Sequence, residues 1–119
     1  MTLEACYEAL GGNYKDVVGR LHSERLVQKF VLKFLDDSSY NNLCRALEEG
    51  VQEEAFRAAH TIKGMCQNLS FTKLEVSSSA LTEALRAGDM DTAKTLIGGV
   101  QADYESTAAA IRAFQAELS

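Results

Sequence analysis

Apolar residues in this chain recur at alternating spacings of three and four, and its 119 residues include no proline. One stretch shows the pattern most clearly: Ala55, Ala59, Ile62, Cys66 and Leu69. Such spacing places side chains on one stripe of an α-helix. A half-buried strand would need apolar residues at every second position, and no segment of strand length shows that alternation. The sequence therefore predicts an all-α protein.

Turn-forming and capping residues mark the ends of the predicted helices. Residues 1–21 are predicted to form a short helical lead-in, broken at a Gly-Gly-Asn turn. Ser23 is placed to cap a helix over about 24–37. Residues 38–50 either form a separate helix or continue the preceding one after a kink, and a glycine ends this piece. The stripe of the 24–37 helix comprises Leu26, Phe30, Val31, Phe34 and Leu35.

Three further helices follow at short intervals. They are predicted over about 52–68, 71–87 and 89–118. Asp89 is placed to cap the last helix, and Gly98-Gly99 is expected to loosen that helix near its start. Four long apolar stripes joined by short turns predict an antiparallel four-helix bundle with short extra N-terminal helices. We expect one domain over 1–119, with the bundle over 22–119.

Composition excludes several classes of function. A net charge of -5 argues against non-specific nucleic-acid binding, which depends on cationic side chains. No apolar run approaches the roughly 18 residues of a membrane span, and the first residues do not resemble a secretory signal. The three cysteines are widely spaced and, with the two histidines, match no zinc pattern. We therefore expect a cytoplasmic monomer that holds no metal and binds neither membranes nor nucleic acid.

His60, Lys63 and Gly64 are the candidate reactive group. Positions i, i+3 and i+4 share one face of a helix, and the apolar stripe of the 52–68 helix lies almost opposite, so His60 is predicted to face solvent. Imidazole is a good nucleophile near neutral pH and can take a phosphoryl group from an aspartyl-phosphate. Lys63 would stabilise the charge of that group. Gly64 would leave room for the loops of a bulky partner.

Residues on either side of His60 are candidates for partner docking. Phe56 and Gln67 lie one turn before and about two turns after it, and Arg57 adds positive charge to an otherwise acidic chain. A basic patch there would complement an acidic pocket on a partner. Arg57 could equally pair with a neighbouring glutamate on the surface. His22 has no such neighbours and is predicted to be a loop residue.

The run His60-Thr61-Ile62-Lys63-Gly64 resembles the H-x-x-K-G motif of histidine-containing phosphotransfer (HPt) domains, and the resemblance covers roughly residues 24–115. HPt domains are four-helix bundles that pass a phosphoryl group between receiver aspartates in two-component phosphorelays. The resemblance implies that His60 is phosphorylated and that Lys63 and Gly64 accompany it. It implies response-regulator receiver domains, and a hybrid sensor histidine kinase, as partners. The chain needs no cofactor and is not an autonomous enzyme in this interpretation, with Mg²⁺ in the receiver partner.

The chain departs from the HPt pattern at two positions. Ser70 stands where many members have a glycine, in the turn after the histidine helix. Thr82 stands where many members place a Gln or Glu that steadies the imidazole. A threonine hydroxyl has a shorter reach, so Thr82 is only a candidate for orienting His60. The first departure concerns turn geometry, and the second concerns the chemistry of the site.

Two other functions fit the same residues. A helical adaptor would bind receiver or kinase domains through the His60 face without being phosphorylated. The histidine-bearing domain of a chemotaxis-type kinase is a third interpretation, disfavoured because no kinase or dimerisation segment accompanies it.

Overall fold

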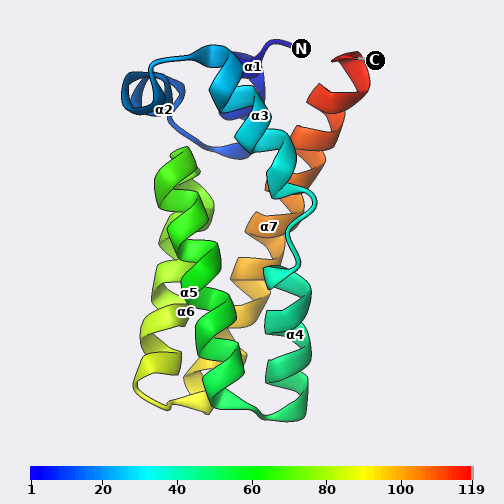
Figure 1. The fold of residues 1–119 in the computed structure, drawn as a ribbon. Helices are drawn as coiled ribbons and strands as arrows, with labels where there is room; N and C mark the ends of the chain where they lie inside the picture. Colours follow the sequence, from blue (N-terminus) through cyan, green and yellow to red (C-terminus); the bar gives the residue numbers. More distant parts are fainter. Residues whose placement is uncertain (119) are drawn as a thin grey trace.

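The computed structural model describes residues 1–118, which fold into seven α-helices and no strand (Figure 1). The all-α prediction is confirmed. The helices are α1 (Leu3–Leu10), α2 (Tyr14–Leu21), α3 (Glu24–Phe34), α4 (Ser39–Glu49), α5 (Gln52–Leu69), α6 (Thr72–Arg86) and α7 (Met90–Leu118).

The four helices from α4 to α7 lie lengthwise beside one another, and the chain reverses direction at each short turn between them (Figure 1). Helix α5 packs against α4 on one side and α6 on the other, and α6 packs against α7. Helices α1, α2 and α3 gather at the end of the bundle where α5 finishes, and α1 packs on α7. One hydrophobic core includes side chains from all seven helices. The fold is therefore a helical bundle to which the N-terminal helices contribute core residues.

The stripe predicted on α5 is buried along its whole length. Ala55, Ala59, Ile62 and Cys66 are each 0% exposed, and Leu69 is 4% exposed. The small alanines let the neighbouring helices approach closely, and burial of the larger side chains stabilises the contact. The helix is thus anchored along one side, which leaves its opposite face free for contacts outside the chain.

Helices α3 and α4 are separate, so the one-helix alternative for residues 24–50 is wrong. Helix α3 ends at Phe34, about three residues earlier than predicted. The amide of Asp36 donates to the carbonyl of Lys33, which tightens the last turn, and Asp37 Oδ1 accepts from the amide of Ser39 at 2.7 Å. This side-chain bond provides the amide of Ser39 with a partner other than a helical carbonyl and favours a new helix start.

Two predictions about helix details have different outcomes. Asp89 does cap α7, since its Oδ1 accepts from the amide of Thr92 at 3.1 Å. The expectation that Gly98-Gly99 loosens α7 is wrong, because the helix runs unbroken from Met90 to Leu118. Packing of α7 against its neighbours outweighs the weak helix propensity of two glycines.

Candidate functional site

His60 lies on the solvent-exposed face of α5, opposite the buried stripe, as the spacing predicted. The imidazole is parallel to the ring of Phe56, with ring centroids 5.7 Å apart and an interplanar angle of 6°. Within residues 1–118 no group makes a hydrogen bond to the imidazole. Its nitrogens are therefore available to a reactant from outside the chain.

Lys63 and Gly64 lie beside His60, and few contacts with the rest of the described chain hold them. Lys63 is half-buried and makes no ion pair or hydrogen bond with any described residue. Gly64 is exposed, and a Cβ added there would meet no atom within 4 Å. Packing inside this chain therefore does not require a glycine at position 64. Because Gly64 has no side chain, no atoms project from the helix surface at this position beside His60.

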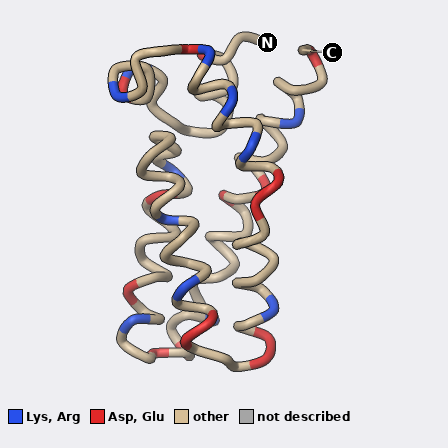
Figure 2. The backbone as a smooth tube through the Cα atoms, viewed as in Figure 1, with Lys and Arg blue, Asp and Glu red and all other residues tan. Residues whose placement is uncertain are grey.

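Charges of both signs occur along α5. Acidic Glu53 and Glu54 occupy its first turn, Arg57 lies between them and His60, and Lys63 follows His60. Figure 2 shows the acidic and basic positions along the backbone of the bundle. Arg57 pairs with Glu53 at 2.9 Å, and the two side chains are 70% and 76% exposed. The surface-pairing alternative for Arg57 is thus what the structure shows. An exposed i,i+4 pair contributes about 0.3–0.5 kcal/mol, so a partner could displace it easily. Gln67 is exposed near the end of the same face.

Thr82 does not orient His60, which corrects the prediction made from its position. Its side chain is 0% exposed, and its hydroxyl donates to the carbonyl of Ser78 at 2.7 Å. A threonine inside a helix commonly bonds the carbonyl one turn back, and burial between packed helices holds it there. The imidazole of His60 is instead in contact with the ring of Phe56.

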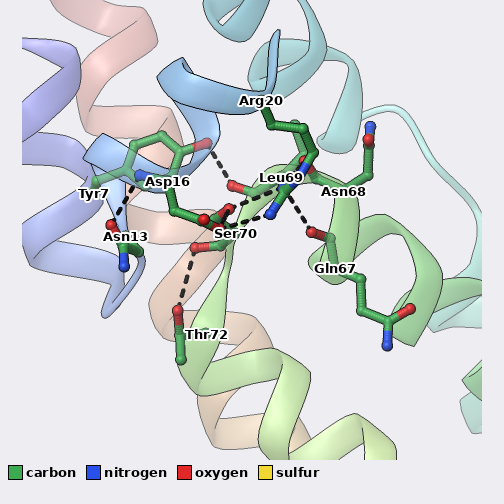
Figure 3. A network of polar contacts seen from close by, with 9 residues as sticks. All are labelled: Tyr7, Asn13, Asp16, Arg20, Gln67, Asn68, Leu69, Ser70 and Thr72. Carbon is green, nitrogen blue, oxygen red and sulfur yellow. Dashed lines mark hydrogen bonds and ion pairs between the residues drawn. The ribbon is translucent and has the colours of Figure 1, made fainter.

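Ser70 keeps the left-handed turn that a glycine would otherwise make at the end of α5. Its φ is 56° and its ψ is 41°, a conformation that costs most residues about 1 kcal/mol or more. The hydroxyl donates to Asp16 Oδ2 at 2.6 Å and accepts from Arg20 Nη1 at 3.0 Å (Figure 3). The amide of Asn13 donates to the carbonyl of Ser70 at 2.9 Å. A Cβ on Gly12 would lie 2.8 Å from that same carbonyl oxygen, so a glycine is required at this close approach.

Arg20 secures the last turn of α5 from the neighbouring α2, a contact that no sequence pattern predicted. Its Nη1 donates to the carbonyls of Gln67 at 2.9 Å and Asn68 at 2.8 Å (Figure 3). Nη2 pairs with Asp16 at 2.6 Å. These bonds occupy carbonyls that have no partner within the helix, and they place positive charge at the negative end of its dipole. The i,i+4 spacing of the Asp–Arg pair was visible in the sequence, but nothing local indicated its reach to α5.

The hydrogen bond from Ser70 is the main cause that holds the pKa of Asp16 below its ordinary value, and Arg20 lowers it further. Tyr7, on α1, also contacts the end of α5: its buried hydroxyl donates to the carbonyl of Leu69 at 2.8 Å. Contacts from α1 and α2 thus secure the last turn of the helix that carries His60.

A shallow polar groove of about 350 Å³ lies between α4 and α5, close to the His60 face. Its lining includes Arg45, Glu54 and Arg57. The mixed charges suit a protein surface more than a single anion. Within residues 1–118, no three or more His, Cys, Asp or Glu side chains are grouped so that they could hold a metal ion.

A family model for the Hpt domain matches residues 26–113. The chain belongs to the Hpt domain family. The match includes His60, Lys63 and Gly64 and leaves out α1 and α2, whose residues provide the contacts to the end of α5. Searches among curated proteins and among solved structures found no match.

Membership of the Hpt family indicates a phosphotransfer role in two-component signalling. Hpt domains act as phosphocarriers and interact with response-regulator receiver domains. In the part of the chain that the structure describes, no helix is long and apolar enough to cross a membrane.

Proposed function

We propose that this Hpt domain carries a phosphoryl group on His60 between receiver aspartates of a phosphorelay. The observation that supports the proposal most strongly is an exposed imidazole, free of hydrogen bonds to described residues, on a helix anchored by its opposite face. A carrier must present its nucleophile to several partners, and a convex helix face allows this where a closed pocket would not. Lys63 and Gly64 lie on the same face, in the spacing typical of the family.

The proposed chemistry is a reversible exchange between two leaving groups. A ring nitrogen of neutral His60 uses its lone pair to form a P–N bond, while the P–O bond to the receiver aspartate breaks and the carboxylate leaves. The other ring nitrogen keeps its proton. The ammonium group of Lys63 stabilises negative charge on the phosphoryl oxygens, as cations do in phosphoryl transfer. Attack by a second receiver aspartate on the same phosphorus regenerates His60.

The partners follow from this chemistry. Each receiver would supply the aspartate and the Mg²⁺, and a hybrid sensor histidine kinase would be the source of phosphoryl groups through its receiver. Phe56, Arg57 and Gln67 surround His60 on the exposed side of α5 and would form the margin of the docking surface. The displaceable Arg57–Glu53 pair could exchange its glutamate for an acidic residue of the receiver.

We propose further that the protein is a cytoplasmic monomer. All three cysteines are free, and two of them, Cys6 and Cys66, are buried. Burial raises the pKa of the Cys6 thiol to about 11 and also raises the pKa of Cys66. Buried thiols of this kind are inert and fit a reducing compartment.

The test is transfer from a receiver domain phosphorylated at its aspartate. We compare the wild type with His60→Gln and, as a matched control, with His22→Gln, which alters the only other histidine. The expected result is an acid-labile, alkali-stable label on the wild type and on His22→Gln, and none on His60→Gln. Label on His60→Gln would overturn the proposal. Receiver binding without label on the wild type would instead favour the adaptor.

A further inference from the structure

Phe56 is the one described side chain that stacks on the ring of His60. The two residues are four apart on α5, and their rings are parallel within 6° at a centroid distance of 5.7 Å. Phe56 is itself half-buried and packs against the core, so the core contacts hold its ring in place. An exposed imidazole without hydrogen bonds would otherwise occupy several rotamers. The parallel contact with Phe56 favours the rotamer in which the two rings stack.

Arg86 reaches the same aromatic ring from α6. Its guanidinium carbon lies 5.0 Å from the centroid of the Phe56 ring, within the range of a cation–π interaction. Glu83, one turn earlier on α6, contacts Arg86 Nε at 3.4 Å and favours this position of the side chain. Three side chains from two helices thus form a series in which Arg86 contacts Phe56 and Phe56 contacts His60.

We propose that Phe56 and Arg86 are positioning residues for phosphoryl transfer, which hold the imidazole of His60 by stacking in place of a hydrogen bond. The inference rests on the proposed function, adds Arg86 to the site and gives Phe56 a second role. Transfer requires the attacking nitrogen, the phosphorus and the leaving oxygen to be nearly in line, so a restricted ring reacts faster than one that rotates freely. Thr82 cannot perform this role, because its hydroxyl is buried and bonded within α6.

The decisive variants change one side chain at a time. Phe56→Leu keeps an apolar side chain but removes the aromatic face, and Phe56→Tyr is the matched control that keeps it. Arg86→Gln removes the cation, and Arg86→Lys keeps it. For each protein we would measure phosphotransfer with a charged receiver that labels the wild type, and separate the rate at saturating receiver from the half-saturating receiver concentration. In parallel, NMR would follow the chemical shifts of the His60 ring protons.

The stacking predicts a defined order of effects. Phe56→Leu should slow saturated transfer by about 3- to 10-fold, from the worth of an aromatic pair. Arg86→Gln should slow it by about 2- to 5-fold, since the cation is partly exposed. The controls Phe56→Tyr and Arg86→Lys keep the aromatic face and the cation, so each should be slowed less than Phe56→Leu and Arg86→Gln, respectively. In Phe56→Leu the His60 ring protons should also lose the upfield shift that a stacked aromatic ring causes.

A double variant tests the series itself. If Arg86 acts through Phe56, then Phe56→Leu combined with Arg86→Gln should be as slow as Phe56→Leu alone. The inference would be overturned if the effects of the two substitutions multiplied in the double variant. It would also be overturned if Phe56→Leu left the saturated rate unchanged, or if it changed only the half-saturating receiver concentration. A wild type that accepts no phosphate would refute the proposed function itself, which is a separate outcome. Far-UV circular dichroism on every variant would verify that the helices are intact.

Discussion

Removal of Arg20 tests whether α2 stabilises the end of the helix that carries His60. The guanidinium donates to the carbonyls of Gln67 and Asn68 and to the hydroxyl of Ser70, and it pairs with Asp16. Arg20→Ala removes all four interactions together while the helical backbone of α2 can persist, because alanine has the highest helix propensity. We expect a loss of stability well above that of an ordinary surface substitution.

The size of this loss can be worked out from the contacts. Hydrogen bonds contribute about 0.5–1.5 kcal/mol each, and a cation at a helix C-terminus about 0.3–1 kcal/mol. The side chain of Arg20 is 40% exposed, so we take the lower part of each range and count little for the ion pair. The sum is about 2 kcal/mol of unfolding free energy. For a chain of this size that corresponds to a fall in melting temperature of about 8 °C.

Urea unfolding followed by far-UV circular dichroism measures this difference directly. Arg25→Ala is the matched control, because Arg25 is an exposed arginine on α3 that makes no ion pair or hydrogen bond with a described residue. The control should stay within about 0.5 kcal/mol of the wild type. If Arg20→Ala were no less stable than Arg25→Ala, with an unchanged dependence on urea, the structural role of the Arg20 contacts would be refuted.

Three further predictions concern the turn and the site. Ser70→Ala should be less stable than Ser70→Gly by about 1 kcal/mol in the same urea assay, because glycine relieves the left-handed strain and alanine does not; equal stabilities would contradict this. The pKa of Asp16 in the folded state lies below its ordinary value, so its contribution to stability is present above about pH 4 and is lost as pH falls through the folded pKa. The difference in unfolding free energy between wild type and Asp16→Asn should therefore shrink as the pH is lowered. A difference that stayed constant with pH would count against the ion pair and the Ser70 bond. Gly64→Ala should raise stability by up to about 1 kcal/mol yet slow phosphotransfer from a receiver; transfer at the wild-type rate would show that access beside His60 is not limiting.

The helix carrying His60 was predictable because its signal is local. Ala55, Ala59 and Ile62 repeat at helical spacing, so their burial and the solvent exposure of His60 follow from one periodicity. The motif around His60 is also contiguous, so the family resemblance is visible in the amino-acid sequence alone. The early end of α3 is not visible in the sequence because it depends on the tightened turn at Lys33 and on the bond that Asp37 accepts from the amide of Ser39.

Contacts between distant segments were not predictable. Ser70 and Asp16 are 54 positions apart, and their hydrogen bond depends on how α2 packs on the end of α5. Arg86 meets Phe56 only because α6 runs beside α5. The prediction for Thr82 rests on its distance along the sequence from His60, whereas its actual partner is the carbonyl of Ser78 one turn away. In each case the geometry of two packed helices decides the partner, and a sequence pattern within one helix does not report it.

The location of the phosphoryl group after transfer from a charged receiver tests the role of His60 most directly. Peptide mapping by mass spectrometry at neutral or alkaline pH preserves a phosphoryl group on nitrogen and distinguishes the peptide of His60 from that of His22. We expect phosphate on His60 alone. Phosphate on His22, on a serine or on an aspartate, with His60 unmodified, would contradict the role of His60 as the phosphoryl carrier.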